Sequence, residues 1–313
     1  MAKKGAQMIL IANYEGRAGV PTSAKLLKEG KDSLRSIIEG IKVVESDETI
    51  RTVGRGGWPN ILGEVELDAA VMDGDTLQTG AVGAVRGFAH PVEIAYEVMQ
   101  RLQYEILVGT GAERFASDIG AEKIENLIEN SKRGWEKHLD LVLTAQEKKD
   151  FPRVKLFALK SEAVDPEKCH DTTVYIAKDG SGKISSATST SGWAWKHPGR
   201  LGDSPIIGAG SYADSRYGAC ACTHTGEMAI RVGVARSVVL YMKMGMRVEE
   251  AVYEVVKDLR QLKTGYLSEL TIHAIDAQDN YKVVSFNGSE PVYYLVYKEC
   301  MSEPKVEQAE YVE

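Results

Sequence analysis

Short apolar runs and helically spaced apolar positions follow one another along the first half of the chain. Residues 8–13 form an apolar run that predicts a strand, and apolar side chains between 34 and 44 recur at helical spacing. Residues 66–72 and 79–85 flank an Asp-Gly-Asp turn and predict a pair of strands. Residues 91–102 predict a helix that opens on a proline, and a short strand and two further helical stretches follow it.

The second half has a different pattern. Segment 130–169 is crowded with Lys, Glu and Asp and shows weak periodicity, so we expect an exposed connector there. Residues 172–177 and 183–190 flank an Asp-Gly-Ser-Gly turn, which predicts a β-hairpin. The remaining expected elements are two helices, 227–244 and 248–263, and three strands, 270–275, 282–286 and 291–300.

These elements interleave without the regular strand–helix rhythm of a doubly wound sheet. Hairpins with helices between them favour two stacked sheets with helices packed outside, which is a layered α+β fold. A length of 313 residues suits either two domains or one large unit.

Composition narrows the function classes. The 38 basic and 45 acidic residues give a net charge of −7, which argues against a nucleic-acid partner. No apolar run approaches the roughly 20 residues that a membrane span needs, and the apolar run after residue 8 is too short for a signal-peptide core. Four cysteines are too few for a disulfide scaffold, so we expect a cytoplasmic, reduced protein. With six scattered histidines we also expect no metal and no cofactor.

The residues alone leave the chemistry open. The glycine-rich stretch 52–57 neither follows a clear strand nor opens a helix, so it predicts a tight turn rather than a nucleotide-binding loop. The second half holds a cluster of hydroxyl and charged residues, which includes Thr172, the run 188–190, and Arg200 with Asp203. Such residues are ordinary in strands and in loop ion pairs, and they also occur in enzyme sites.

Five segments, in the same order along the chain, resemble the glycosylasparaginase family of N-terminal nucleophile hydrolases, whose relatives are the plant-type asparaginases and isoaspartyl peptidases. The resemblance extends from about residue 8 to residue 300. The segments are VGRGGWPN at 53–60, VELDAAVMDG at 65–74, HDT at 170–172, ATSTSG at 187–192 and PGRLGDSPIIGAG at 198–210.

The resemblance implies one catalytic domain over residues 1–313 with a four-layer αββα sandwich. It also implies self-cleavage of the bond between Asp171 and Thr172, which gives an alpha chain 1–171 and a beta chain 172–313. In that step Asp171 is expected to assist, and His170 to shape the loop. The mature protein is expected to be a homodimer of such alpha–beta units.

The resemblance also implies the catalytic groups. Thr172 is the expected nucleophile, and its freed α-amino group, with a reference pKa of about 7.7–8.0, is the expected base. The hydroxyl of Thr190, across the hairpin, is expected to bond the nucleophile. Thr223, through its hydroxyl, and His224, through its backbone N–H, are expected to form the oxyanion hole.

Substrate recognition follows from the same resemblance. Arg200 is expected to bind the α-carboxylate and Asp203 the α-ammonium of an asparagine. Tyr14 stands where the family has a tryptophan that lines the pocket, and His224 stands where the family has glycine. The expected reaction releases aspartate from asparagine linked to N-acetylglucosamine (GlcNAc). The alternatives are an isoaspartyl peptidase or L-asparaginase, and a non-processing homologue with a binding role; no nucleic acid or membrane is expected as a partner.

Overall fold

The computed structural model describes residues 7–159 and 172–313, so His170 and Asp171 lie outside the described residues. The described strands form two sheets. The eight-stranded sheet has the order β12 (Lys305–Gln308), β11 (Tyr293–Lys298), β1 (Ile9–Asn13), β5 (Thr173–Lys178), β6 (Ile184–Thr190), β2 (Leu67–Asp73), β3 (Thr79–Val85) and β4 (Ile106–Val108). The five-stranded sheet has the order β13 (Glu310–Val312), β10 (Tyr281–Phe286), β9 (Leu270–Asp276), β8 (Gly218–His224) and β7 (Ser211–Asp214).

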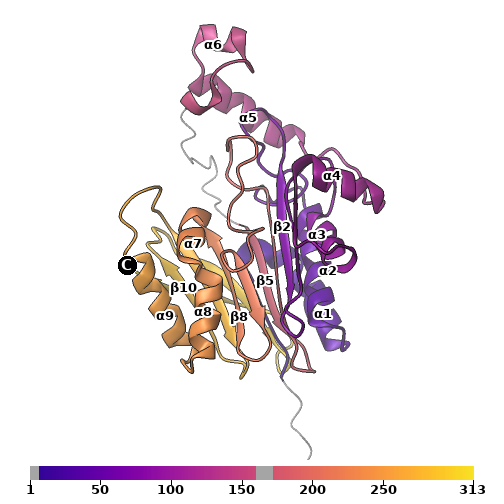
Figure 1. Ribbon diagram of the computed structural model, residues 1–313, viewed down its shortest axis with the longest axis vertical. Coiled ribbons are helices and arrows are strands. Elements are labelled where there is room, and N and C mark those ends of the chain that lie inside the picture. The colour runs from indigo at the N-terminus through magenta and orange to yellow at the C-terminus, as the bar shows by residue number, and fades with distance from the viewer. Residues whose placement is uncertain (1–6, 160–171) are drawn as a thin grey trace, which may run out of the picture.

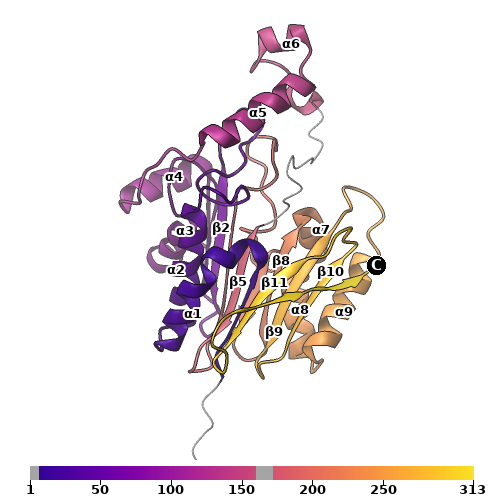
Figure 2. The ribbon, with the colours of Figure 1, turned by 180° about the vertical axis from the view of Figure 1, so that it is seen from behind.

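Helices cover the outer face of each sheet, as Figures 1 and 2 show from opposite sides. Helices α1 (Val20–Lys28), α2 (Ser33–Ser46), α3 (Pro91–Arg101) and α4 (Gly109–Asp118) lie against the eight-stranded sheet. Helices α7 (Gly226–Val232), α8 (Val234–Lys243) and α9 (Val248–Leu259) lie against the five-stranded sheet. The two sheets therefore face each other in the middle of the molecule.

The alternation of side chains along β1 and β5 explains why both strands are apolar throughout. Leu10 and Tyr175 pack on the helix side, whereas Ile11, Val174 and Ile176 pack between the two sheets. A strand that is buried on both faces reads as a continuous apolar run, which is the pattern of residues 8–13. The nucleophile expected at the start of β5 is thus carried by a strand in the centre of the protein.

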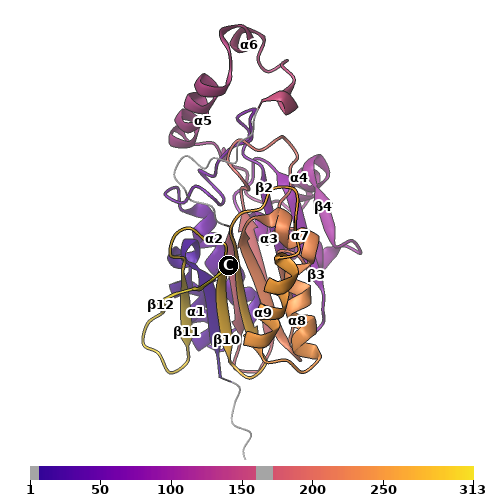
Figure 3. The ribbon, with the colours of Figure 1, turned by 90° about the vertical axis from the view of Figure 1, so that its left-hand side faces the viewer.

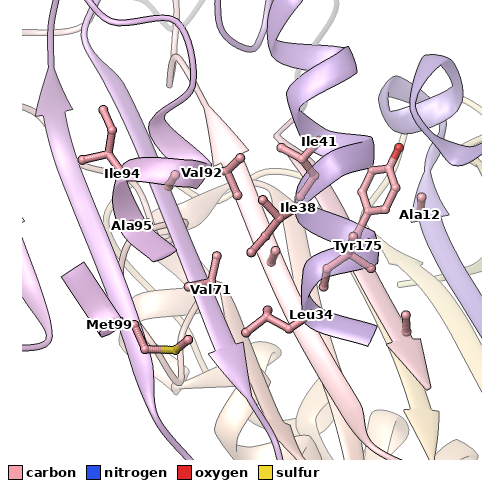
Figure 4. Close-up of a cluster of buried hydrophobic side chains, with 14 of the residues drawn as sticks. Ala12, Leu34, Ile38, Ile41, Val71, Val92, Ile94, Ala95, Met99 and Tyr175 are labelled. Atoms are coloured by element: carbon pink, nitrogen blue, oxygen red, sulfur yellow. The ribbon is translucent and has the colours of Figure 1, made fainter. Parts of the chain in front are cut away.

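Helix α2 shows how the outer layer is held. Leu34, Ile38 and Ile41 recur at helical spacing and lie together over the sheet, close to Val71 and Tyr175 (Figure 4). Burying side chains of this size contributes about 1.5–3 kcal/mol each. The Tyr175 hydroxyl donates a hydrogen bond to the Gly16 carbonyl at 2.5 Å, which ties the short 3-10 helix η1 (Tyr14–Ala18) to β5.

The segment expected to be an exposed connector has regular structure in its described part, up to residue 159. It contains α5 (Glu129–Val142), α6 (Ala145–Asp150) and the short 3-10 helix η2 (Leu156–Ala158), and α5 and α6 project beyond the two sheets (Figure 3). Most of its polar side chains are exposed, but Trp135 and Leu139 pack with Trp195. Other apolar residues of the segment, among them Leu143, Phe151 and Leu159, join the same cluster, so its charged sequence concealed an apolar edge.

Several other elements differ from the expectation, and α1, β12 (Lys305–Gln308) and β13 (Glu310–Val312) were not predicted. The helix predicted for 227–244 is divided into α7 and α8 because Gly233 adopts φ +65°, a left-handed conformation that ends the first helix. Strands β7 and β8 were not predicted, because the sequence GACAC in β8 consists of small residues without a clear alternation. These residues are buried between the other sheet and α8.

Candidate active site

Asn13, the last residue of β1, fixes the main chain at Thr172. Its side-chain amide donates a hydrogen bond to the Thr172 carbonyl at 2.5 Å, and its side-chain oxygen accepts from the Val174 N–H at 3.0 Å. The bond that is expected to be cleaved joins Thr172 to Asp171, which is outside the described residues. Asn13 therefore holds the expected nucleophile from the side that remains after cleavage.

The Thr172 hydroxyl lies 3.2 Å from the hydroxyl of Ser204. The Ser204 carbonyl in turn accepts from the Thr188 hydroxyl at 2.8 Å, so the loop that follows β6 is fastened to the hairpin. Thr172 itself is 8% exposed. The Thr172 hydroxyl thus belongs to a largely buried residue and has a defined partner.

Thr190 lies next to Thr172 in the hairpin, because the neighbouring pair Thr173 and Ser189 is in register. Its hydroxyl donates to the Thr52 carbonyl at 3.3 Å and accepts from the Gly192 N–H at 2.9 Å. In this arrangement Thr190 shapes the turn after β6, and the hydroxyl that faces Thr172 belongs to Ser204.

Arg200 is held by an acidic and an aromatic neighbour. Its Nε and Nη2 donate to one oxygen of Glu227, at 3.1 and 2.7 Å, and its guanidinium lies 4.3 Å from the centre of the Trp193 ring. Stacking on an aromatic ring and charged hydrogen bonds fix the plane of a guanidinium. A carboxylate ligand of Arg200 must therefore share the guanidinium with Glu227 or displace it.

Asp203 is a buried carboxyl group whose Oδ2 has no hydrogen-bond partner within the part of the chain that the structure describes. Burial raises the pKa of Asp203 to about 7. A Cβ atom placed on Gly226 would lie 2.5 Å from its other oxygen, so only glycine fits at the start of α7. Buried polar groups are normally paired, so a cationic group placed beside Oδ2 would supply the missing partner.

Three further charged groups lie beneath the loop that carries Arg200. Both carboxylate oxygens of Glu66 accept from the Gly199 N–H, at 3.0 and 3.1 Å, and the Lys196 amine donates to the Glu66 carbonyl at 3.2 Å. Burial lowers the pKa of Lys196 and raises that of Asp68, which also accepts from the Ala84 N–H at 2.8 Å. The loop is therefore supported by buried charged groups as well as by apolar residues such as Trp195.

The end of β8 brings two more expected residues to the site. The Thr223 hydroxyl is 3.0 Å from His224 Nδ1, and His224 Nε2 is 3.5 Å from Glu269. His224 has φ +80°, which is uncommon for a residue with a side chain. Its side chain is 8% exposed, so the imidazole is enclosed rather than directed to solvent.

Tyr14 follows Asn13 directly and begins η1. It is 41% exposed, its ring lies 6.4 Å from the ring of Tyr293, and the Arg17 guanidinium lies 5.0 Å from its centre. Tyr14 is therefore an exposed ring, one residue from the group that holds Thr172.

The contacts connect the expected residues into one region. Ser204 joins Thr172 to the loop of Arg200 and Asp203, and Gly226 and Glu227 join that loop to the end of β8. Sequence reasoning did not assign roles to Asn13, Ser204 or Glu227. Asn13 precedes Tyr14 and Ser204 follows Asp203, so position next to an expected residue was the available signal.

The described residues contain no group of three His, Cys, Asp or Glu side chains able to hold a metal ion. In the same part of the chain, no helix is both long and apolar enough to cross a membrane. The groups that do converge are two hydroxyls, a guanidinium and a buried carboxyl. Together they can bind a small molecule with one negative and one positive charge and present a hydroxyl to it.

Comparison with known proteins identifies the family. The pattern of the family described as Asparaginase matches residues 17–278. The isoaspartyl peptidase/L-asparaginase of Mus musculus is 36% identical over 76% of this chain and 68% of its own length. The plant-type L-asparaginase of Pyrococcus furiosus is 33% identical over 92% and 90%. The N(4)-(beta-N-acetylglucosaminyl)-L-asparaginase of Elizabethkingia miricola is 35% identical over 78% and 70%. The chain therefore belongs to the asparaginase family, an amidohydrolase family of the N-terminal nucleophile hydrolases.

Proposed function

We propose that this protein cleaves the side-chain amide of asparagine linked to GlcNAc and releases aspartate, with Thr172 as a nucleophile exposed by self-cleavage. The observation that carries the proposal is that Arg200 and the buried Asp203, whose Oδ2 has no hydrogen bond to any described residue, stand in the loop whose Ser204 contacts the Thr172 hydroxyl. The two sheets with outer helices fit the four-layer αββα sandwich that the sequence resemblance implies.

The first chemical step uses the new N-terminus. Cleavage before Thr172 frees its α-amino group, which accepts the hydroxyl proton while Oγ1 attacks the amide carbon of the substrate. The resulting oxyanion is directed at the Thr223 hydroxyl and the His224 backbone N–H. The ammonium then gives its proton to the leaving amine, and an ester of Thr172 remains.

The second step returns the enzyme to its starting state. The amine accepts a proton from water as the water oxygen attacks the ester carbon, and collapse of that intermediate returns the proton to Thr172 Oγ1 and releases aspartate. Asn13 holds the Thr172 carbonyl through both steps, so the nucleophile is not displaced when its bonding changes.

Recognition requires a free amino-acid end. The guanidinium of Arg200 pairs with the α-carboxylate, and the carboxylate of Asp203 pairs with the α-ammonium. An asparagine within a peptide has neither charge, so it leaves the buried Asp203 unpaired and binds poorly. This is why the proposed substrates are free asparagine derivatives.

An isoaspartyl peptidase or L-asparaginase activity is the second candidate, because the plant-type asparaginase matches a larger share of this chain than the glycosylasparaginase does. All three activities use the same nucleophile and the same amino-acid end. They differ only in the group attached to the side-chain carbonyl: a sugar amine, a peptide amine or ammonia.

The test begins with the intact mass of purified protein. We expect fragments of residues 1–171 and 172–313, and Edman sequencing of the second should begin Thr-Thr-Val-Tyr. Hydrolysis of GlcNAc–Asn, β-Asp-Leu and Asn is then compared at equal concentration. Thr173→Ala is a matched control. It removes the neighbouring hydroxyl but keeps the Thr172 hydroxyl and the bond between Asp171 and Thr172.

A single uncleaved chain with no hydrolysis after prolonged incubation contradicts the proposed mechanism and favours a binding role. Cleavage with preferred turnover of β-Asp-Leu or Asn contradicts the proposed substrate and favours the second candidate.

A further inference from the structure

The imidazole of His224 connects the proposed oxyanion hole to a carboxylate. His224 Nδ1 is 3.0 Å from the Thr223 hydroxyl, and Nε2 is 3.5 Å from Glu269. Main-chain pairing keeps these groups together, because Thr223 pairs with Thr271 and His224 with Leu270, and the Thr225 N–H donates to the Glu269 carbonyl. The contact is therefore built by two adjacent strands.

A hydroxyl has only one proton to donate, so the state of the ring decides where that proton goes. When His224 is neutral with its proton on Nε2, toward Glu269, Nδ1 accepts the Thr223 proton. When His224 is protonated, Nδ1–H donates to Thr223 Oγ1, and the hydroxyl proton is free for another acceptor. Glu269 stabilises the protonated ring, because an opposite charge nearby favours the charged form.

We propose that His224 is a positioning residue whose protonation directs the Thr223 hydroxyl toward the oxyanion of the reaction. This inference rests on the proposed function and adds to it a pH control that the Thr172 amine alone does not provide. Turnover needs the amine neutral and His224 protonated at the same time, so activity falls on both sides of an optimum. The alkaline limb belongs to His224, and the acid limb to the amine.

The other titratable groups near His224 do not produce an alkaline limb. Burial, followed by the charge of His224, lowers the pKa of His273 on β9 to about 3, so His273 stays neutral. Burial raises the pKa of the Cys222 thiol on β8 well above its usual value, so it stays protonated. Burial raises the pKa of Asp203, on the loop that contacts α7, to about 7, so the loss of its charge falls on the acid side.

The experiment compares pH profiles of kcat for cleaved wild type, His224→Gly and His224→Asn. Glycine and asparagine both accept a positive φ, and both keep the backbone N–H. We expect kcat of the wild type to fall by at least about tenfold on the alkaline side. The upper limit of this fall is the loss of about 10²–10³-fold that removal of one oxyanion donor causes. Both variants should lose that limb and reach a plateau at high pH.

Glu269→Gln provides a second variant in which the ring remains. It removes the charge that favours protonation, so the alkaline limb should move to lower pH by about one unit. His138→Asn is the matched control, because His138 is stacked on Trp195 away from the site and its loss should leave the profile unchanged.

A readout independent of turnover is the proton position on the ring, measured by nitrogen NMR of labelled histidine. We expect the Nε2–H form of His224 at high pH; the Nδ1–H form contradicts the inference. An active His224→Gly enzyme that keeps the alkaline limb contradicts the inference alone. A wild type that is cleaved but hydrolyses none of the three substrates contradicts the proposed function as well.

Discussion

The two sides of the proposed site differ in how completely their polar groups are paired. On the nucleophile side, both the carbonyl and the hydroxyl of Thr172 have partners. On the anchoring side, one carboxylate oxygen each of Asp68, Asp203 and Glu227 is buried and has no hydrogen bond to any described residue. The geometry of the proposed nucleophile is therefore set by described partners, whereas the proposed anchoring side keeps carboxylate oxygens that a ligand would pair.

Unpaired groups of this kind are costly in the empty protein. A buried donor or acceptor without a partner costs about 1–3 kcal/mol, and more when it is charged. A ligand that supplies the missing partner recovers this free energy on binding, and it stabilises the fold through linkage. Variants on the two sides should therefore differ in kind: changes at Thr172 stop the chemistry, and changes at the anchors weaken binding.

The largest effect is expected from Thr172→Ala. The variant has no hydroxyl to attack the preceding carbonyl or the substrate, so it should remain one chain and show no turnover above background. Thr172→Ser keeps the hydroxyl and should still be cleaved, although more slowly. Intact mass and a hydrolysis assay measure both results, and turnover by a cleaved alanine variant would remove Thr172 from its role.

Arg200→Lys tests the anchoring side with the charge retained. Lysine cannot reproduce the planar, multidentate contacts of arginine, so we expect KM to rise by about 10- to 100-fold, with a smaller change in kcat. Arg236→Lys is the matched control, because Arg236 also stacks on an aromatic ring, Tyr212, outside the site. Equal KM values for the two variants would mean that Arg200 does not bind the substrate.

Asp203→Asn tests the role of the buried charge. Because the pKa of Asp203 is raised to about 7, KM of the wild type should decrease as the pH rises through 7 and the carboxylate forms. The variant should have a KM that is higher at pH 8, by about tenfold, and that no longer changes through pH 7. A variant that keeps the pH dependence would assign it to another group.

The same substitution should affect stability in the opposite direction. The folded protein holds the Asp203 proton up to about pH 7, whereas an unfolded chain releases it near its ordinary pKa of about 3.9. The contribution of Asp203 to the free energy of unfolding of the wild type therefore falls as the pH rises from about 4 to 7. We expect ligand-free Asp203→Asn to have a higher Tm than the wild type at pH 8, with a smaller difference at pH 5.

The smallest effect is expected at Tyr14. Tyr14→Trp enlarges the aromatic surface, at about 25 cal/mol for each Å² covered, so KM for GlcNAc–Asn should fall a few-fold, and more than KM for Asn. Unchanged KM values for both substrates would mean that the exposed ring of Tyr14 packs against Tyr293 and Arg17 and does not line the pocket. Isothermal titration of an uncleavable substrate analogue measures the same difference directly.

Local patterns were enough to predict the elements with a regular apolar period. Strand β1, the hairpin of β5 and β6, and α2 were expected close to their observed bounds. Strand β8 was missed because Ala, Cys and Gly carry little periodic signal. Its position is set by pairing with β9, a contact between segments about fifty residues apart.

The residues of the candidate site also differ in whether a local pattern could predict them. The residues proposed to carry the chemistry stand in motifs and could be named from the sequence. Their partners could not be named, because Asn13 meets Thr172 from 159 positions away and Ser204 meets it from 32. A side-chain contact over such a separation depends on the strand order, which no local pattern encodes.

The strand order has a consequence for the mature protein. Strand β1, from the chain that would end at residue 171, lies between β11 and β5, which both come from the chain that would begin at Thr172. After such a cleavage the two polypeptides would be interwoven within one hydrogen-bonded sheet, so neither could leave without unfolding both. Unfolding would then become a dissociation, and refolding a bimolecular encounter whose rate depends on concentration. A precursor that folds as a single chain would not have that requirement, so each molecule would have one concentration-independent opportunity to reach its structure: before the proposed self-cleavage.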